Sequence, residues 1–126
     1  MDEGRSDELV ALGHPGADRY AGLETFENPG VTRIEMTSDE LVALGPVNEQ
    51  PDLYTVTIGY TPGGRCLESK SLKLYLARFR NEVVFCEELA VRIRDDLAHA
   101  LGVEAAAVQV TLRQKARGGI TIVASA

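Results

Sequence analysis

The chain has 126 residues, enough for one domain with its own core and too few for two. A net charge of −6, a pI near 4.9, no Trp and 6% aromatic residues argue against a broad nucleic-acid interface. No apolar run approaches the roughly 20 residues that a membrane span needs.

The N-terminus is acidic and polar, without the basic segment and apolar core of a signal peptide. The two cysteines, Cys66 and Cys86, are too few for a disulfide framework. With two His besides, all far apart in sequence, they predict no zinc site, and we expect no metal. We therefore expect a cytoplasmic protein with reduced thiols.

Residues 1–29 are rich in Gly, Pro, Asp and Glu and predict an irregular arm. The octapeptide SDELVALG occurs at residues 6–13 and again at 38–45. Two copies do not make a solenoid, which needs at least three repeats, and we have no physical account of the identity.

Two strands are predicted next. Residues 31–37 alternate in character, and residues 46–52 form a loop with two prolines. Residues 53–60 give the clearest strand, because Tyr54, Val56, Ile58 and Tyr60 fall on one face. The segment 62–64 ends it.

From Ser69 the period changes to that of a helix. One apolar stripe contains Leu72, Leu76 and Phe79, with Tyr75 beside them. A second helix carries a stripe at every fourth residue and ends at Gly102: Phe85, Leu89, Ile93, Leu97 and Leu101. Two strands follow, at 108–113 and 120–124, joined by Arg117-Gly118-Gly119.

The order is therefore strand, strand, helix, helix, strand, strand. We predict an α+β domain over residues 30–126, with an antiparallel four-stranded sheet and two helices on one face. The other face and both sheet edges stay open. Several subunits could cover them by joining their sheets into a closed barrel, so we predict a homo-oligomer.

The segment 68–75, ESKSLKLY, puts two lysines, two hydroxyls and one carboxylate at a helix start. Free backbone N–H groups and nearby lysines there could hold a phosphate. The other interpretation is a capped amphipathic helix with solvated lysines, which the spacing alone favours.

This segment, set between a β-hairpin and two helices, resembles the signature of the 7-cyano-7-deazaguanine reductases. These are NADPH-dependent nitrile reductases of the tunnelling fold, in the pathway to queuosine in tRNA. The resemblance covers roughly residues 20–126. Further segments support it, namely 23–26 (LETF), 50–52 (QPD), 79–81 (FRN), 85–87 (FCE) and 117–120 (RGGI).

The resemblance implies a role for each matching position. The 7-deazaguanine-type ligand is expected to contact Leu67, Glu68, Ser69, Cys86 and Glu87. Glu87 is the best single residue, since two carboxylate oxygens can accept two adjacent N–H groups of a guanine-like edge. NADPH contacts are expected from Ser69, Lys70, Lys73, Arg117 and Gly118. Asp52 matches the proton donor, and the sites are expected at subunit interfaces, without direct nucleic-acid binding.

One position departs from the family. The resemblance implies a cysteine nucleophile in the loop before Gln50-Pro51-Asp52, which adds to the nitrile carbon to form a thioimide that accepts hydride. Gly45 stands at that position, and Asn48-Glu49 replaces the expected Thr-Gly.

Three interpretations follow. The nucleophile has moved to another thiol, of which Cys86 beside Glu87 is the better candidate and Cys66 the weaker. Alternatively, the protein is a divergent paralogue that binds a deazapurine and does different chemistry, for instance in secondary metabolism, or none. In the third, Gly45 is an engineered replacement that traps the ligand, which the second change at Asn48-Glu49 makes less natural.

Overall fold

The computed structural model describes residues 22–126. The elements, in chain order, are β1 Thr25–Glu27, β2 Ile34–Leu44, β3 Pro51–Tyr60, β4 Arg65–Leu67, α3 Ser69–Ala77, a 3₁₀ turn Arg78–Asn81, α4 Cys86–Leu101, a 3₁₀ turn Ala105–Ala107, β5 Val108–Arg117 and β6 Ile120–Ser125. The first copy of the octapeptide and most of the predicted arm lie outside the described residues.

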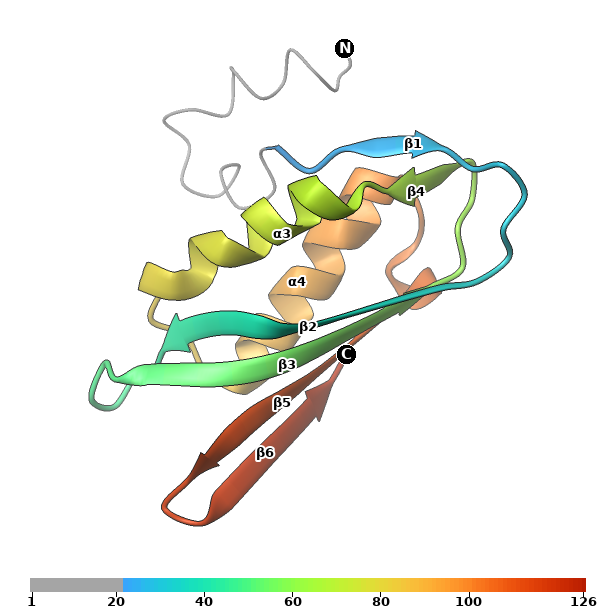
Figure 1. The fold of residues 1–126 in the computed structure, drawn as a ribbon. Coiled ribbons are helices and arrows are strands. Elements are labelled where there is room, and N and C mark those ends of the chain that lie inside the picture. The colour runs from blue at the N-terminus through green and yellow to red at the C-terminus, as the bar shows by residue number, and fades with distance from the viewer. Residues whose placement is uncertain (1–21) are drawn as a thin grey trace.

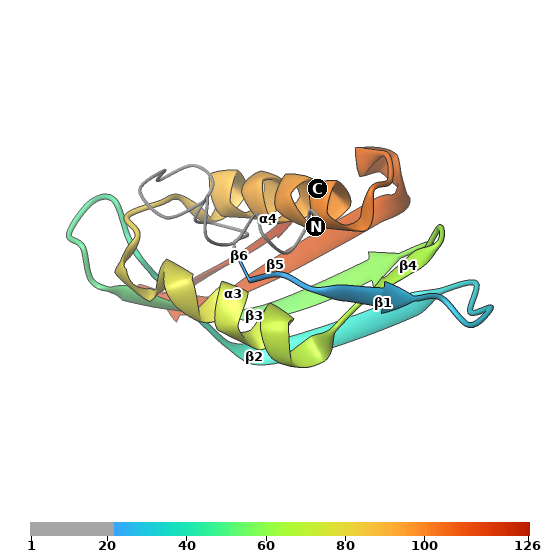
Figure 2. The same cartoon turned by 90° about the horizontal axis from the view of Figure 1, so that it is seen from above.

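The main sheet has the strand order β2-β3-β5-β6, with every neighbouring pair antiparallel. Helices α3 and α4 lie together on one of its faces (Figure 1), as the view from above also shows (Figure 2). The predicted α+β order ββααββ is confirmed for this sheet. The edges, β2 and β6, pair with no further strand in the described part of the chain.

The core forms where the inward side chains of β3, which recur at every second residue, pack against the apolar stripes of the helices. The predicted inward residues of β3 are all at most 2% exposed, and in α4 Leu89, Ile93 and Leu97 are fully buried. The prediction that Phe85 belongs to the buried stripe of α4 is wrong. Phe85 is the N-cap residue of α4 and is 56% exposed, because the helix begins only after it. Gly102 ends α4 as predicted, with the left-handed φ of 70° that glycine adopts without strain.

The predicted boundaries of the first strand were wrong. β2 begins at Ile34 rather than residue 31 and continues through the second octapeptide copy to Leu44. A register shift between Ser38 and Leu41 then allows Leu41 and Ala43 to point into the core, where they are 1% and 0% exposed. Three polar residues at 38–40 hide this continuation from a simple alternation pattern.

The arm is not irregular throughout. Residues Thr25–Glu27 form β1, which pairs antiparallel with β4 in a separate two-stranded sheet. Such a short strand depends on a partner 40 residues away in sequence, so local pattern does not predict it. Within residues 22–126, no helix is long and apolar enough to cross a membrane.

Candidate functional site

The loop between β2 and β3 contains the position of the expected nucleophile. Its ends are joined by two backbone hydrogen bonds: Gly45 N–H donates to Gln50 O at 2.9 Å, and Glu49 N–H donates to Gly45 O at 2.8 Å. Glu49 has a φ of 56°, a left-handed conformation that is unfavourable for a residue with a side chain. The loop therefore keeps the backbone shape that suits a glycine at position 49, where the resemblance implies one.

Asp52 lies directly against Gly45. It is the second residue of β3, points to the helix-covered face and is 7% exposed. A Cβ atom added to Gly45 would lie 2.9 Å from Asp52 Oδ2. The structure thus brings the expected proton donor into contact with the expected nucleophile position.

The other oxygen of this carboxylate has a cationic partner. Asp52 Oδ1 accepts a hydrogen bond from Arg117 Nη1 at 3.0 Å, and the same nitrogen donates to Pro51 O at 2.9 Å. Arg117 is the last residue of β5, just before the Gly118-Gly119 turn, in which both glycines have positive φ. The arginine assigned to cofactor phosphate is therefore already paired with the expected proton donor.

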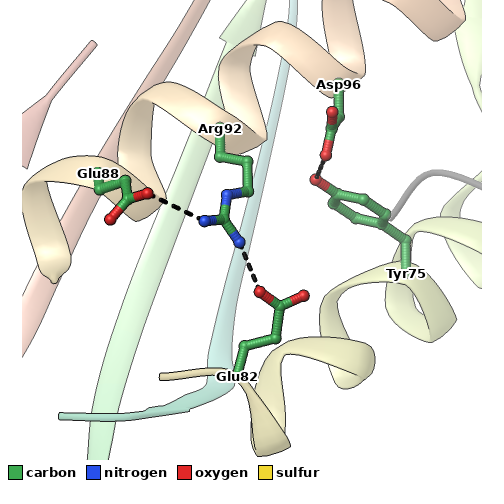
Figure 3. A network of polar contacts seen from close by, with 5 residues as sticks. All are labelled: Tyr75, Glu82, Glu88, Arg92 and Asp96. Carbon is green, nitrogen blue, oxygen red and sulfur yellow. Dashed lines mark hydrogen bonds and ion pairs between the residues drawn. The ribbon is translucent and has the colours of Figure 1, made fainter. Parts of the chain in front are cut away.

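The start of α4 is tied to the end of β2. Leu44 N–H donates to Glu82 O at 2.8 Å, and Val84 N–H donates to Leu44 O at 3.0 Å. Arg92 of α4 pairs with Glu82 and with Glu88, which fixes this connecting segment to the helix (Figure 3). Consequently Cys86 and Glu87, the first residues of α4, are held near the β2–β3 loop.

Cys86 and Glu87 differ in exposure. Glu87 is exposed, whereas Cys86 is 3% exposed. Burial, followed by the negative charges of Glu87 and Asp52, raises the pKa of the Cys86 thiol to about 11. Near neutral pH the group is a neutral thiol, which is a poor nucleophile.

Tyr54 belongs to the same group of residues, and the sequence interpretation treated it only as core. It lies two residues after Asp52 on the same strand face and is 2% exposed. Its hydroxyl is buried and has no hydrogen-bond partner among the described residues. Burial and the charges of Cys86, Asp52 and Glu87 raise its pKa, in that order. In the sequence, the two-residue spacing from Asp52 to Tyr54 could have indicated that both side chains share one face of the strand.

The segment 68–75 begins as a capped helix. The Glu68 carboxylate is the N-cap of α3 and accepts hydrogen bonds from Lys70 N–H at 3.0 Å and Ser71 N–H at 2.7 Å. These bonds are the main cause of a lowered pKa at Glu68. The carboxylate thus occupies two of the backbone donors that a phosphate at this helix start would use.

The neighbouring residues of this segment are placed differently. Leu67 is 4% exposed, and its N–H donates to the Tyr60 hydroxyl at 2.8 Å. Ser69, Lys70 and Lys73 are exposed on α3. The predicted capped helix with solvated lysines is therefore confirmed, while the two lysines remain available to a ligand.

The structure does not bring all the residues of the predicted NADPH group together in one chain. Position 45, Asp52, Cys86 and Glu87 gather at one end of the sheet. The first turn of α3, with Lys70, lies away from the β5–β6 turn that contains Gly118 (Figure 1). Among residues 22–126, no group of three or more His, Cys, Asp or Glu side chains is arranged to hold a metal ion.

Comparisons with known proteins agree with the resemblance. The family model described as "QueF-like protein" matches residues 51–126. A protein of Frankia casuarinae named NADPH-dependent 7-cyano-7-deazaguanine reductase is 48% identical over 120 residues, which cover 93% of each chain. A Chlorobium chlorochromatii protein of the same name is 41% identical, over 79% of this chain and 86% of its own.

The fold is shared with a solved structure. The archaeosine synthase QueF-Like in the apo form superposes with a TM-score of 0.69 at 20% identity, covering 77% of this chain and 93% of the other. This likeness supports the α+β tunnelling fold. The family match and the identity to relatives over 79% to 93% of the chain together show that this chain belongs to the QueF-like family of 7-cyano-7-deazaguanine reductases.

Proposed function

We propose that this protein binds 7-cyano-7-deazaguanine and acts as an NADPH-dependent nitrile reductase of the queuosine pathway. The observation that carries the proposal is the group formed by position 45, Asp52, Cys86 and Glu87. These residues come from the β2–β3 loop, β3 and α4, and they meet at one end of the sheet. The related proteins that match this chain are named 7-cyano-7-deazaguanine reductases.

Two carboxylates divide the work in this proposal. Glu87, exposed in the first turn of α4, accepts the adjacent N–H groups of the guanine-like edge. Asp52, buried beside position 45, is the proton donor in this proposal: its carboxyl group takes up a proton from solvent and delivers it to the nitrile nitrogen as that bond is reduced. Arg117 holds the Asp52 carboxylate in place through its hydrogen bond.

NADPH, when bound, supplies hydride for the reduction. The residues present fit its phosphates in part. Lys70 and Lys73 are exposed and make no ion pair with another described residue, so they can pair with phosphate oxygens. The Lys70 and Ser71 N–H groups are not available to a phosphate, because they donate to Glu68. Arg117 could bind a phosphate only while it also pairs with Asp52.

A second candidate is a protein that binds the heterocycle without reducing it. Gly45 has no side chain to attack the nitrile, and Cys86 is a buried neutral thiol. These two facts favour ligand binding without a covalent adduct, or different chemistry at the same pocket.

We also infer a homo-oligomer that completes the sites at subunit interfaces. Among residues 22–126, no strand pairs with the outer edges of β2 and β6 and no helix covers the second sheet face, which supports this inference. Within one chain, the first turn of α3 with Lys70 and the β5–β6 turn with Gly118 lie apart. One NADPH molecule could therefore contact both only if a second subunit contributed one of them. The two free cysteines fit a reducing compartment such as the cytoplasm.

The test is incubation with 7-cyano-7-deazaguanine, with NADPH absorbance and intact mass followed together. Oxidation of NADPH in step with formation of the aminomethyl product supports the reductase. Binding without oxidation or adduct supports the second candidate, and absence of binding contradicts both. Cys86→Ala decides between the thiols: an adduct that survives this change does not form on Cys86.

A further inference from the structure

We propose that the Tyr54 hydroxyl is a ligand-binding group of this site, whose O–H donates a hydrogen bond to an acceptor atom of the bound heterocycle. The inference rests on the proposed function, because it names a contact inside the same pocket. The heterocycle offers suitable acceptors in its ring carbonyl, its ring nitrogen and its nitrile nitrogen.

The first support is the unsatisfied hydroxyl itself. Buried polar groups in folded proteins almost always have a partner, and a buried group without one destabilises the fold. Tyr54 is 2% exposed, and its hydroxyl has no hydrogen-bond partner among residues 22–126. Phenylalanine would fill the same space without leaving an unpaired hydroxyl, so the core alone gives no reason for tyrosine here.

A comparison within β3 sharpens this point. Tyr60 lies on the same face of the same strand and is fully buried. Its hydroxyl accepts a hydrogen bond from Leu67 N–H at 2.8 Å. One of two buried tyrosines on this strand therefore has an internal partner, whereas the other does not.

The second support is the position of the hydroxyl. Strand geometry places Tyr54 on the same face as Asp52, one pleat along β3. The Asp52 carboxylate contacts Arg117 with one oxygen and faces Gly45 with the other. Cys86, Asp52 and Glu87 all interact electrostatically with the phenol. The strand register and these interactions place Tyr54 at the same end of the sheet as the candidate site.

The protonation state of the phenol allows it to act as a donor. Burial and the surrounding negative charges raise its pKa, so the proton stays on the oxygen at any physiological pH. A protonated phenol among carboxylates complements a ligand that presents N–H donors to Glu87 and an acceptor to Tyr54.

Tyr54→Phe in the full chain tests the proposal with two readouts. Calorimetric titration with 7-cyano-7-deazaguanine should give a Kd higher by about fivefold to a hundredfold, as expected for one lost hydrogen bond. The melting temperature of the ligand-free protein should rise by about 3 °C or more, since the unpaired hydroxyl is gone. Tyr60→Phe, the matched control, should lower the melting temperature instead.

The outcomes separate this inference from the proposed function. If the unchanged protein does not bind the ligand, the proposed function fails. If it binds and Tyr54→Phe binds equally well, or if Tyr54→Phe melts lower as Tyr60→Phe does, the inference is overturned. Titration with 7-aminomethyl-7-deazaguanine identifies the acceptor: a loss with both ligands points to the ring, and a loss with the nitrile alone points to its nitrogen.

Discussion

Gly45→Ala probes the contact between Gly45 and Asp52 at the centre of the candidate site. A Cβ atom at position 45 would lie 2.9 Å from Asp52 Oδ2, whereas ordinary contact begins at 3.4 Å, so the carboxylate must move by about 0.5 Å. Asp52 cannot move freely, because its other oxygen is held by Arg117 at 3.0 Å. The same displacement is required of any cysteine at this position.

The magnitude follows from three opposing contributions. Overpacking in a buried site costs about 1–3 kcal/mol, and loosening an ion pair with a half-exposed arginine costs less than about 1 kcal/mol. Replacing glycine stabilises by about 0.4–1 kcal/mol through the unfolded chain. We expect a net loss of about 1–2 kcal/mol, which lowers the melting temperature by about 4–10 °C.

Thermal unfolding of four variants measures this effect. Gly64→Ala is the matched control, because a Cβ there would meet nothing within 4 Å, and we expect little change. Asp52→Ala should cost less in the Gly45→Ala background than alone, since it removes the overlapping atom. If Gly45→Ala is as mild as Gly64→Ala, or if the two changes are additive, the proposed contact is refuted.

Three further predictions concern the residues around this contact. Glu49→Gly should raise the melting temperature slightly, because the φ of 56° costs a residue with a side chain about 1–2 kcal/mol, more than the roughly 0.4–1 kcal/mol that glycine costs through the unfolded chain. Glu68→Ala should destabilise the fold near neutral pH; the folded pKa of Glu68 is lowered, so its contribution is present above the ordinary value of 4.5 and is lost as the pH falls through the folded pKa. Thermal melts at neutral and acidic pH check this, and equal losses at both would contradict it. Alkylation of Cys86 by iodoacetamide at pH 7.5, followed by mass spectrometry in a Cys66→Ala background, should be at least about a hundredfold slower than that of the unfolded chain, because a pKa of about 11 instead of 9.0 lowers the thiolate fraction by that factor. Fast alkylation of the folded protein would restore Cys86 as a candidate nucleophile.

The sequence was sufficient where burial repeats with a regular period. The alternation in β3 and the four-residue spacing from Leu89 to Leu101 predicted their elements and inward faces, because each pattern records which side of one element is hidden from water. Gly102 and the Gly118-Gly119 turn were also predictable, since positive φ favours glycine strongly. That Gly45 stands where the resemblance implies a cysteine needed no structure at all.

Only the tertiary structure decided the contacts between distant segments. The strand β1, the extension of β2 past its register shift, and the pair between Asp52 and Arg117 depend on partners far away in sequence. The unpartnered hydroxyl of Tyr54 belongs to the same class, because the absence of a partner is visible only when every neighbour is placed.

Glu68 and Gly45 also show what the sequence determined and what only the fold determined. The sequence placed Glu68 at a helix start, yet the fold determined that its carboxylate caps the helix and so occupies donors offered to a phosphate. The sequence showed that Gly45 lacks a nucleophile, and the fold added that Asp52 lies against it. The resemblance therefore named the candidate site residues, and three-dimensional packing decided what each of them touches.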